Sequence, residues 1–221
     1  MPPDPGVAAP SVDAPPVAGV LLAGGLARRM GGGDKGLMEL GGETILARVI
    51  ARARPQVGAL ALNANGDPAR FAAYDLPVVA DVIGGFAGPL AGVLTGMIWA
   101  REHAPGCAWV ASFATDAPFL PSDLVARLLQ AVERERADMA CAASGGRPHP
   151  VFGLWPVRLA EDLRRAVADE GVRKVDVWTA RYRLAVAEFA AAPVDPFFNA
   201  NRPDDLVEAE RLLTRLDGAV A

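Results

Sequence analysis

The sequence predicts a single α/β domain, and three observations lead to this fold class. Short apolar runs alternate with helical patterns, as expected for a largely parallel sheet that helices cover on both faces. The length of 221 residues suits one large domain with a sizeable core. Hydrophobic residues make up 52% of the chain and charged residues 22%, which is ordinary for a globular protein. We expect the domain at 17–216, after a disordered Pro/Ala-rich lead-in at 1–16 and before a frayed tail at 217–221.

The elements follow in order from local patterns. Thr44 is expected to cap a helix that Pro55 ends, and Ser122 to cap another; a third clear helix starts at Pro203. The strand candidates are short apolar runs, at 17–23, 58–63, 76–80, 107–113, 137–142, 149–155 and 183–188. Parallel strands bind ligands beyond their carboxyl ends, so the loops at 24–36, 63–67 and 114–118 are expected to gather at one edge.

Bulk properties exclude several classes of protein. A net charge of −4 offers no basic surface for nucleic acid. Cys107 and Cys141 are far apart in apolar runs, which favours reduced thiols in a cytoplasmic protein. The segment 82–100 is uncharged, but glycines and Pro89 break its first half, so we expect a buried helix packed closely on the sheet and no membrane span. No cation precedes the apolar run at 17–27 after the start methionine, unlike a secretory signal.

The most informative segment is the loop that follows the first apolar run. Residues 22–37 read LeuAlaGlyGlyLeuAlaArgArgMetGlyGlyGlyAspLysGlyLeu. Glycines let backbone N–H groups converge on an anion, and Arg28, Arg29 and Lys35 add positive charge. The loop therefore predicts a phosphate site. It matches neither the G-x-G-x-x-G nor the G-x-x-x-x-G-K-[ST] pattern, which disfavours a Rossmann dehydrogenase and a P-loop protein.

Further motifs follow this loop along the chain. They are AsnAlaAsn at 63–65, Asp81, GlyProLeuAlaGly at 88–92, ThrAspAlaPro at 115–118, HisProValPheGlyLeuTrp at 149–155 and AsnAlaAsnArgPro at 199–203. With LeuAlaGlyGly, ArgMetGlyGly and AspLysGlyLeu of the opening loop, they resemble the molybdenum cofactor guanylyltransferase family, in the family's order. The resemblance implies a Rossmann-like three-layer domain with a mostly parallel central sheet, of the nucleotide-diphospho-sugar transferase type.

Three residues are the candidates for catalysis. Asp116 follows an apolar strand, and the resemblance implies that it binds Mg²⁺, which accepts few protein ligands beside phosphates and water. The alternative is that Asp116 caps the following turn. Lys35 and Arg29 would neutralise a triphosphate and the departing pyrophosphate, whereas a mobile surface lysine is the alternative for Lys35. Asp34 is expected to orient Lys35 through a local ion pair.

A second group of residues resembles the family's nucleotide contacts. Asn63 and Asp81 carry an amide and a carboxylate that can read a guanine edge or ribose hydroxyls. Leu22, Ala23 and Gly24 would lend backbone groups to the base. Taken without the resemblance, AsnAlaAsnGlyAsp is a turn signal and Asp81 a possible cap.

The acceptor substrate has four candidate contacts. Arg147 and His149 stand at the entry to the strand that ends in Trp155, although a structural role for His149 is equally open. Asn199 and Asn201 precede the last helix, where Asn201 faces the metal or the acceptor's phosphate, or else caps that helix.

The resemblance implies transfer of GMP from GTP to molybdenum-molybdopterin, with Mg²⁺ as cofactor and pyrophosphate as the second product. Cofactor-insertion proteins and molybdoenzyme apoproteins are the implied protein partners. Alternatives are a cytidylyltransferase that uses CTP on the same cofactor, an enzyme acting on a sugar or alditol phosphate, and a catalytically silent protein that presents the cofactor. Base choice depends on loop geometry, so the residues alone leave GTP and CTP open.

Overall fold

The computed structural model describes residues 16–23, 34–84 and 88–219. The strands are β1 (Val17–Leu22), β2 (Glu39–Leu40), β3 (Glu43–Thr44), β4 (Ala59–Asn63), β5 (Val78–Val79), β6 (Trp109–Ala114), β7 (Met139–Ser144), β8 (Arg147–Pro156) and β9 (Leu184–Phe189). The α-helices are α1 (Ile45–Ala53), α2 (Pro89–His103), α3 (Leu124–Glu135), α4 (Ala160–Ala168), α5 (Val175–Thr179) and α6 (Pro203–Ala219). All seven expected strands are therefore present. The ends of each lie within two residues of the expected ends.

The main sheet has seven strands in the order β5-β4-β1-β6-β8-β7-β9. The pairs β1–β4, β1–β6, β4–β5 and β7–β9 are parallel, which confirms the expected class. Strand β8 runs antiparallel to both β6 and β7, so the sheet is mixed. The strand order reverses beside β1, and ligands of such sheets bind outside the carboxyl ends of the strands at this point.

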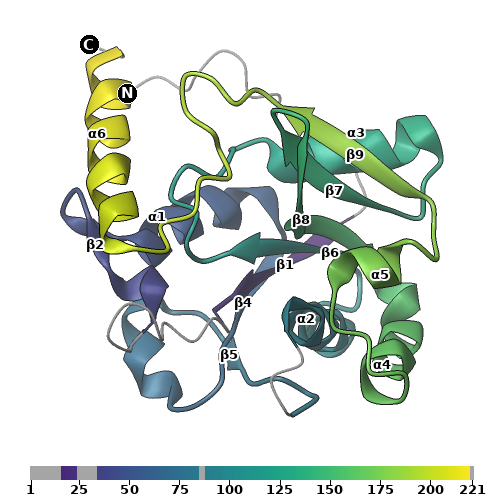
Figure 1. Cartoon of the computed structure of the whole chain (residues 1–221). Helices are drawn as coiled ribbons and strands as arrows, with labels where there is room; N and C mark the ends of the chain where they lie inside the picture. Colours follow the sequence, from purple (N-terminus) through teal and green to yellow (C-terminus); the bar gives the residue numbers. More distant parts are fainter. Residues whose placement is uncertain (1–15, 24–33, 85–87, 220–221) are drawn as a thin grey trace.

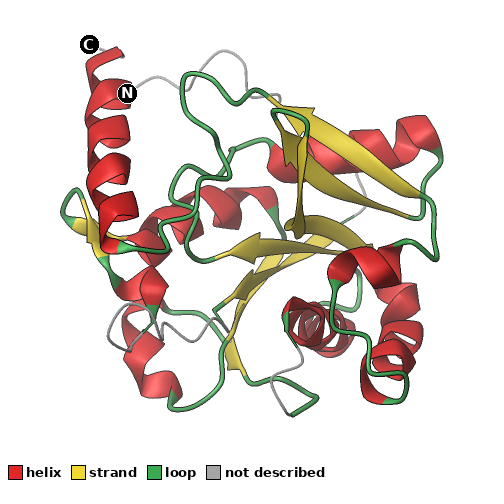
Figure 2. Ribbon diagram, in the orientation of Figure 1, coloured by secondary structure: helices red, strands yellow, loops and turns green. Residues whose placement is uncertain are grey.

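Helices cover both faces of the sheet and give three layers (Figures 1 and 2). On one face α1 and α3 pack with the sheet into a large core that includes Leu46 and Leu128. On the other face α2, α4 and α5 form a second core that includes Leu94 and Trp178. Successive residues of β1 serve the two cores in turn, as the alternation of side chains along a strand requires: Val20 packs under α2 and Leu21 under α1.

The two predicted helix caps differ in outcome. Thr44 caps α1 as predicted, with Oγ1 accepting from the Ala47 N–H at 3.2 Å. Ser122 does not cap α3; the helix begins at Leu124, and the side-chain Oε1 of Gln56 accepts from the Val125 N–H at 2.9 Å. The hairpin β2–β3 and the helices α4 and α5 were not expected from the sequence.

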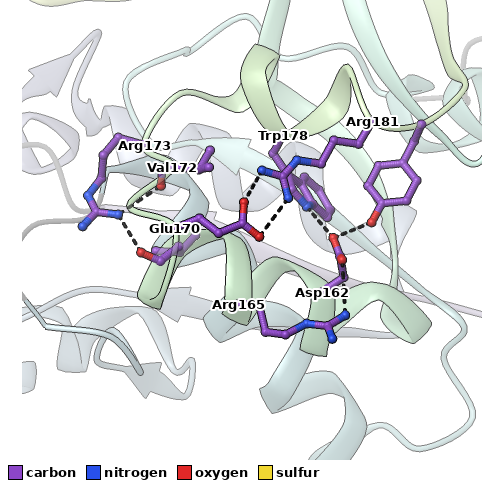
Figure 3. Close-up of polar contacts among 9 residues, drawn as sticks. Asp162, Arg165, Glu170, Val172, Arg173, Trp178 and Arg181 are labelled. Carbon is purple, nitrogen blue, oxygen red and sulfur yellow. Dashed lines mark hydrogen bonds and ion pairs between the residues drawn. The ribbon is translucent and has the colours of Figure 1, made fainter.

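A polar cluster joins α4 and α5 and the residues that follow each of them (Figure 3). The Asp162 carboxylate accepts from the Trp178 indole at 3.1 Å and from the Tyr182 hydroxyl. Burial, followed by this bond to Asp162, raises the pKa of Tyr182 to about 12. Arg181 pairs with Glu170 beside it. These contacts link α4 and the turn after it to α5 and the turn after it.

Within the described part of the chain, no helix is both long and apolar enough to cross a membrane. Segment 82–100 instead contributes α2, which is buried along Leu90–Ala100 as expected. Both cysteines are free; Cys141 is buried, whereas Cys107 is only half-buried. Helix α6 continues to Ala219, and the division into lead-in, domain and tail stays a prediction, since residues 1–15 and 220–221 lie outside the described residues.

Candidate active site

One cavity of about 810 Å³ opens at the carboxyl ends of β1, β4 and β6. It is of the size that small-molecule sites usually have. Nine of the residues predicted to act in catalysis or to contact the nucleotide or the acceptor line it: Leu22, Ala23, Lys35, Asn63, Asp81, Asp116, Arg147, His149 and Asn199. The expected meeting of the three strand-end loops is therefore confirmed for their described residues.

The end of β4 forms a network of amide and carboxylate groups on one side of the cavity. Asn63, which is 3% exposed, donates from Nδ2 to the Val79 carbonyl at 3.1 Å and to Asp81 Oδ1 at 2.9 Å. Asn65 donates to Asp81 Oδ2 at 2.8 Å and accepts from the Asp81 N–H at 2.9 Å. Both carboxylate oxygens of Asp81 are thus held, and their remaining lone pairs can accept from a ligand.

Backbone groups beside this network are partly engaged already. The Ala23 N–H donates to the Asn63 carbonyl at 2.9 Å, and the Leu22 carbonyl accepts from Thr115 Oγ1 at 3.2 Å. The carbonyl of Leu22 keeps a second lone pair, so it can still accept from a base.

Helix α2 approaches this side of the cavity through a glycine. A Cβ at Gly92 would lie 2.7 Å from Leu22 Cδ2 and would overlap Asn63 Oδ1. One turn later, a Cβ at Gly96 would lie 2.7 Å from Val20 Cγ1. The expected close packing of the helix on the sheet therefore depends on Gly92 and Gly96.

Lys35 begins a single 3-10 turn at the mouth of the cavity and is half-buried. Its Nζ donates to Asn201 Oδ1 at 2.5 Å. The expected ion pair between Asp34 and Lys35 is wrong, because Asp34 Oδ2 pairs instead with Arg70 Nε at 2.5 Å. Arg70 also donates to the Asn65 carbonyl at 2.6 Å, so it joins the opening loop to the end of β4.

Asp116 follows β6 and is half-buried. Burial raises the pKa of Asp116, while the nearby positive charge of Lys35 and its own backbone N–H act to lower it. The carbonyl of Asp116 accepts from the Ala200 N–H at 2.9 Å, which ties the segment before α6 to β6. Among the described residues no group of three or more His, Cys, Asp or Glu side chains could hold a metal ion.

The acceptor candidates lie on β8 and on the segment before α6. Arg147 and Asn199 are exposed at the cavity, and His149 is half-buried. His149 Nε2 is 2.7 Å from Ser144 Oγ, and burial lowers the pKa of this imidazole, with Asp195 opposing and Arg147 reinforcing the shift. Asn201 does not cap α6 through its side chain; Asp205 accepts from the N–H groups of Asn201 and Arg202 at 2.8 Å each.

Gly24, Arg28 and Arg29 fall in 24–33, outside the described residues, so their predicted roles are unchanged. The sequence reasoning missed Arg70 and Ser144, which support the site. Asn65 could have been recognised, because it follows Asn63 by two positions at the end of a strand candidate. Arg70 had no such signal, because its charged partner Asp34 is distant in the sequence.

The fold and the pocket define a nucleotidyltransferase, and a family model described as MobA-like NTP transferase domain matches residues 19–182. A molybdenum cofactor guanylyltransferase from Rhodopseudomonas palustris (strain BisB5) is 58% identical over 206 residues, 93% of this chain and 98% of that protein. The chain belongs to the molybdenum cofactor guanylyltransferase family.

Solved structures share the fold at lower identity. Molybdopterin-guanine dinucleotide biosynthesis protein A from Archaeoglobus fulgidus superposes with a TM-score of 0.68 at 22% identity, covering 90% of this chain and 99% of that one. A Mycobacterium tuberculosis protein solved in complex with manganese gives a TM-score of 0.63 at 17% identity, covering 89% and 98%.

Proposed function

We propose that the protein transfers GMP from GTP to molybdenum-molybdopterin, forming molybdopterin guanine dinucleotide and pyrophosphate. One observation carries the assignment of roles: a single cavity contains Lys35 and Asp116 between the Asn63–Asp81 network and the β8 residues Arg147 and His149. Strand order supports the same division, since β4 and β8 flank β1 and β6 on opposite sides. Family membership supports the reaction itself.

The guanosine occupies the β4 side in this proposal. Guanine presents adjacent N–H donors at its amino edge, and ribose presents hydroxyl donors, so either suits the held carboxylate of Asp81. The Asn63 amide keeps that carboxylate in place. The backbone carbonyl of Leu22, and Gly24 beyond the described residues, complete the predicted contacts.

The triphosphate lies over the opening loop, with Lys35 and Arg29 as its cations. Lys35 uses one of its three N–H donors for Asn201, so the other two can bind phosphate oxygens. Charge-assisted bonds from an ammonium to phosphate are stronger than a bond to a neutral amide.

We assign Asp116 to a divalent metal and propose Mg²⁺. The donor fits: Asp116 lines the cavity and carries the hard carboxylate oxygens that Mg²⁺ prefers, and a bound cation would offset the cost of the buried charge. One carboxylate is enough, because Mg²⁺ takes most of its ligands from substrate phosphates and water. When bound, the metal would neutralise charge on the phosphates during transfer.

The reaction then needs positioning and charge stabilisation more than acid–base catalysis. The terminal phosphate of the acceptor is already ionised at neutral pH, so it can attack the α-phosphorus without a general base. Lys35 and Arg29 hold the departing pyrophosphate, and Arg147, His149, Asn199 and Asn201 contact the acceptor.

Nucleotide selectivity is tested by calorimetry with GTP, CTP and ATP in the presence of Mg²⁺. We expect GTP to bind selectively and Lys35→Ala to weaken that binding. Lys174→Ala is the matched control, because Lys174 is the other lysine of the chain and lies exposed before α5. A preference for CTP would move the assignment to a cytidylyltransferase on the same acceptor, and absence of nucleotide binding would refute the proposal.

A further inference from the structure

Three side chains from distant parts of the chain form a linear hydrogen-bond relay at the β8 side of the cavity. Ser144 ends β7, His149 lies on β8, and Asp195 lies in the segment between β9 and α6. Ser144 Oγ is 2.8 Å from Asp195 Oδ1 and 2.7 Å from His149 Nε2. The three elements are thereby joined at one buried hydroxyl, since Ser144 is 3% exposed.

The relay determines which nitrogen of His149 carries the proton. A serine hydroxyl has one hydrogen, and Ser144 donates it to the Asp195 carboxylate, which can only accept. The short contact between Ser144 and His149 must then be donated by the imidazole, from Nε2–H. In the neutral ring this leaves Nδ1 as a bare acceptor.

Packing holds the same ring in one orientation. Phe197 lies against it with ring centroids 4.7 Å apart, and Phe152 approaches edge-on at 6.5 Å. Asp195 fixes Phe197 as well, because Oδ1 accepts from the Phe197 N–H at 3.0 Å. Among the described residues Nδ1 has no hydrogen-bond partner, although His149 lines the cavity.

We propose that His149 recognises the heterocycle of the acceptor, with Nδ1 accepting a hydrogen bond from a pterin N–H group, and that Ser144 and Asp195 are its positioning residues. This inference rests on the proposed function. An ionised phosphate has only acceptor oxygens and would be repelled by a bare nitrogen lone pair, whereas a pterin carries ring N–H and amino donors. The position of His149 agrees with this assignment. In the sheet, β8 lies on the opposite side of β6 and Asp116 from β4, where the guanosine is placed.

The protonation pattern can be measured directly, because the chain contains only two histidines. His103 provides an internal reference of opposite type: its Nδ1 is 3.1 Å from the Trp99 carbonyl, which can only accept, so the neutral ring must carry Nδ1–H. Long-range ¹H–¹⁵N correlation spectra of the full chain labelled in histidine should show Nε2–H for His149 and Nδ1–H for His103. An Nδ1–H form of His149 would overturn the proposal.

Titration separates the heterocycle from the phosphate. Unsubstituted pterin, which has no phosphate, should move the ¹⁵N resonance of His149 Nδ1 in the direction of an accepted hydrogen bond and leave His103 unchanged. Inorganic phosphate should leave the His149 resonances in place. An unmoved Nδ1 at saturating pterin, or a ring protonated by phosphate, would each refute heterocycle recognition.

Kinetics provide a second readout with a matched pair of variants. His149→Phe keeps the aromatic packing but loses Nδ1, so KM for molybdenum-molybdopterin should rise about tenfold, the value of one good hydrogen bond, with an unchanged Kd for GTP. His103→Phe should alter neither constant, because His103 lies at the end of α2 and stacks on Trp99. An unchanged acceptor KM in His149→Phe would contradict the inference, whereas loss of GTP binding by the wild-type protein would instead refute the proposed function.

Discussion

The closest approach between α2 and the nucleotide side of the cavity predicts a specific effect of Gly92→Ala. The added methyl group would lie under 3.0 Å from both Leu22 Cδ2 and Asn63 Oδ1. Asn63 is buried and its amide lies nearest the added methyl group, so its bond to Asp81 Oδ1 is the contact that we expect to yield. We therefore expect the substitution to weaken both the fold and GTP binding.

The magnitude follows from three contributions. Alanine improves the helix by about 1 kcal/mol over glycine, and overpacking costs about 1–3 kcal/mol. Loss of a hydrogen bond to a charged group costs about 1.5–3 kcal/mol more. The free energy of unfolding should fall by about 2–5 kcal/mol, and the Kd for GTP should rise at least tenfold, as a loss of about 1.4 kcal/mol in binding requires.

Gly96→Ala is the matched control in the same helix. Its methyl group would meet the Val20 side chain at 2.7 Å, but no polar group of the cavity. It gains the same helix propensity and meets a similar clash, so the unfolding free energy should fall by only about 0–2 kcal/mol. GTP affinity should equal that of the wild type. Guanidinium unfolding and calorimetry give both quantities, and a Gly92→Ala variant that binds GTP normally would show that the Asn63–Asp81 pair does not position the nucleotide.

Three further outcomes are expected. Asp116→Asn should raise the Tm of the metal-free protein at about pH 7 but not at about pH 4. The pKa of Asp116 is raised in the folded protein, so the wild type loses stability as pH rises from the ordinary carboxyl pKa through the raised one, and the variant does not. Lower stability of the variant at neutral pH would contradict this. Asn201→Asp puts a carboxylate beside Lys35 Nζ, so GTP should bind about tenfold more weakly by calorimetry, and equal or tighter binding would count against Lys35 as a phosphate contact. Ser112→Ala leaves the fully buried Trp155 indole N–H without its acceptor at 2.8 Å and should cost about 1–3 kcal/mol by chemical unfolding, whereas an unchanged midpoint would show that another group accepts that bond.

The strands could be predicted because each is a short apolar run that a two-sided sheet must bury. Their directions could not all be predicted by the same rule. Strand β8 is antiparallel because Gly145 and Gly146, with φ of 55° and 75°, join it to β7 in a two-residue hairpin that pairs Ser144 with Arg147. A Gly-Gly dipeptide between two strand patterns signals such a turn. The same signal at Gly41 and Gly42 marks the missed hairpin β2–β3.

The candidate site likewise has residues that could be predicted from the sequence and contacts that could not. Asn63 and Asp116 could be found because Asn63 ends one apolar strand and Asp116 comes two residues after another, and parallel strands deliver such residues to one edge. The partner of Asp34 could not, because Arg70 reaches it from a 3-10 segment, Pro68–Tyr74, that local patterns do not connect with the loop. Adjacent opposite charges suggested the pair between Asp34 and Lys35; the fold separates them by giving each a distant partner.

The segment between β9 and α6 shows why the motif AsnAlaAsnArgPro at 199–203 belongs to the site. It lies beyond the matched domain at 19–182, yet it contacts three elements of the catalytic edge. Asp195 accepts from Ser144 on β7, the Ala200 N–H donates to the Asp116 carbonyl after β6, and Asn201 holds Lys35 of the opening loop. Asp195, which accepts from Ser144, and Asn201, which accepts from Lys35, therefore lie on one short stretch of chain. That stretch contacts both the β8 side of the cavity and the opening loop, so its contacts with the site could be assigned only once the fold had brought these distant residues together.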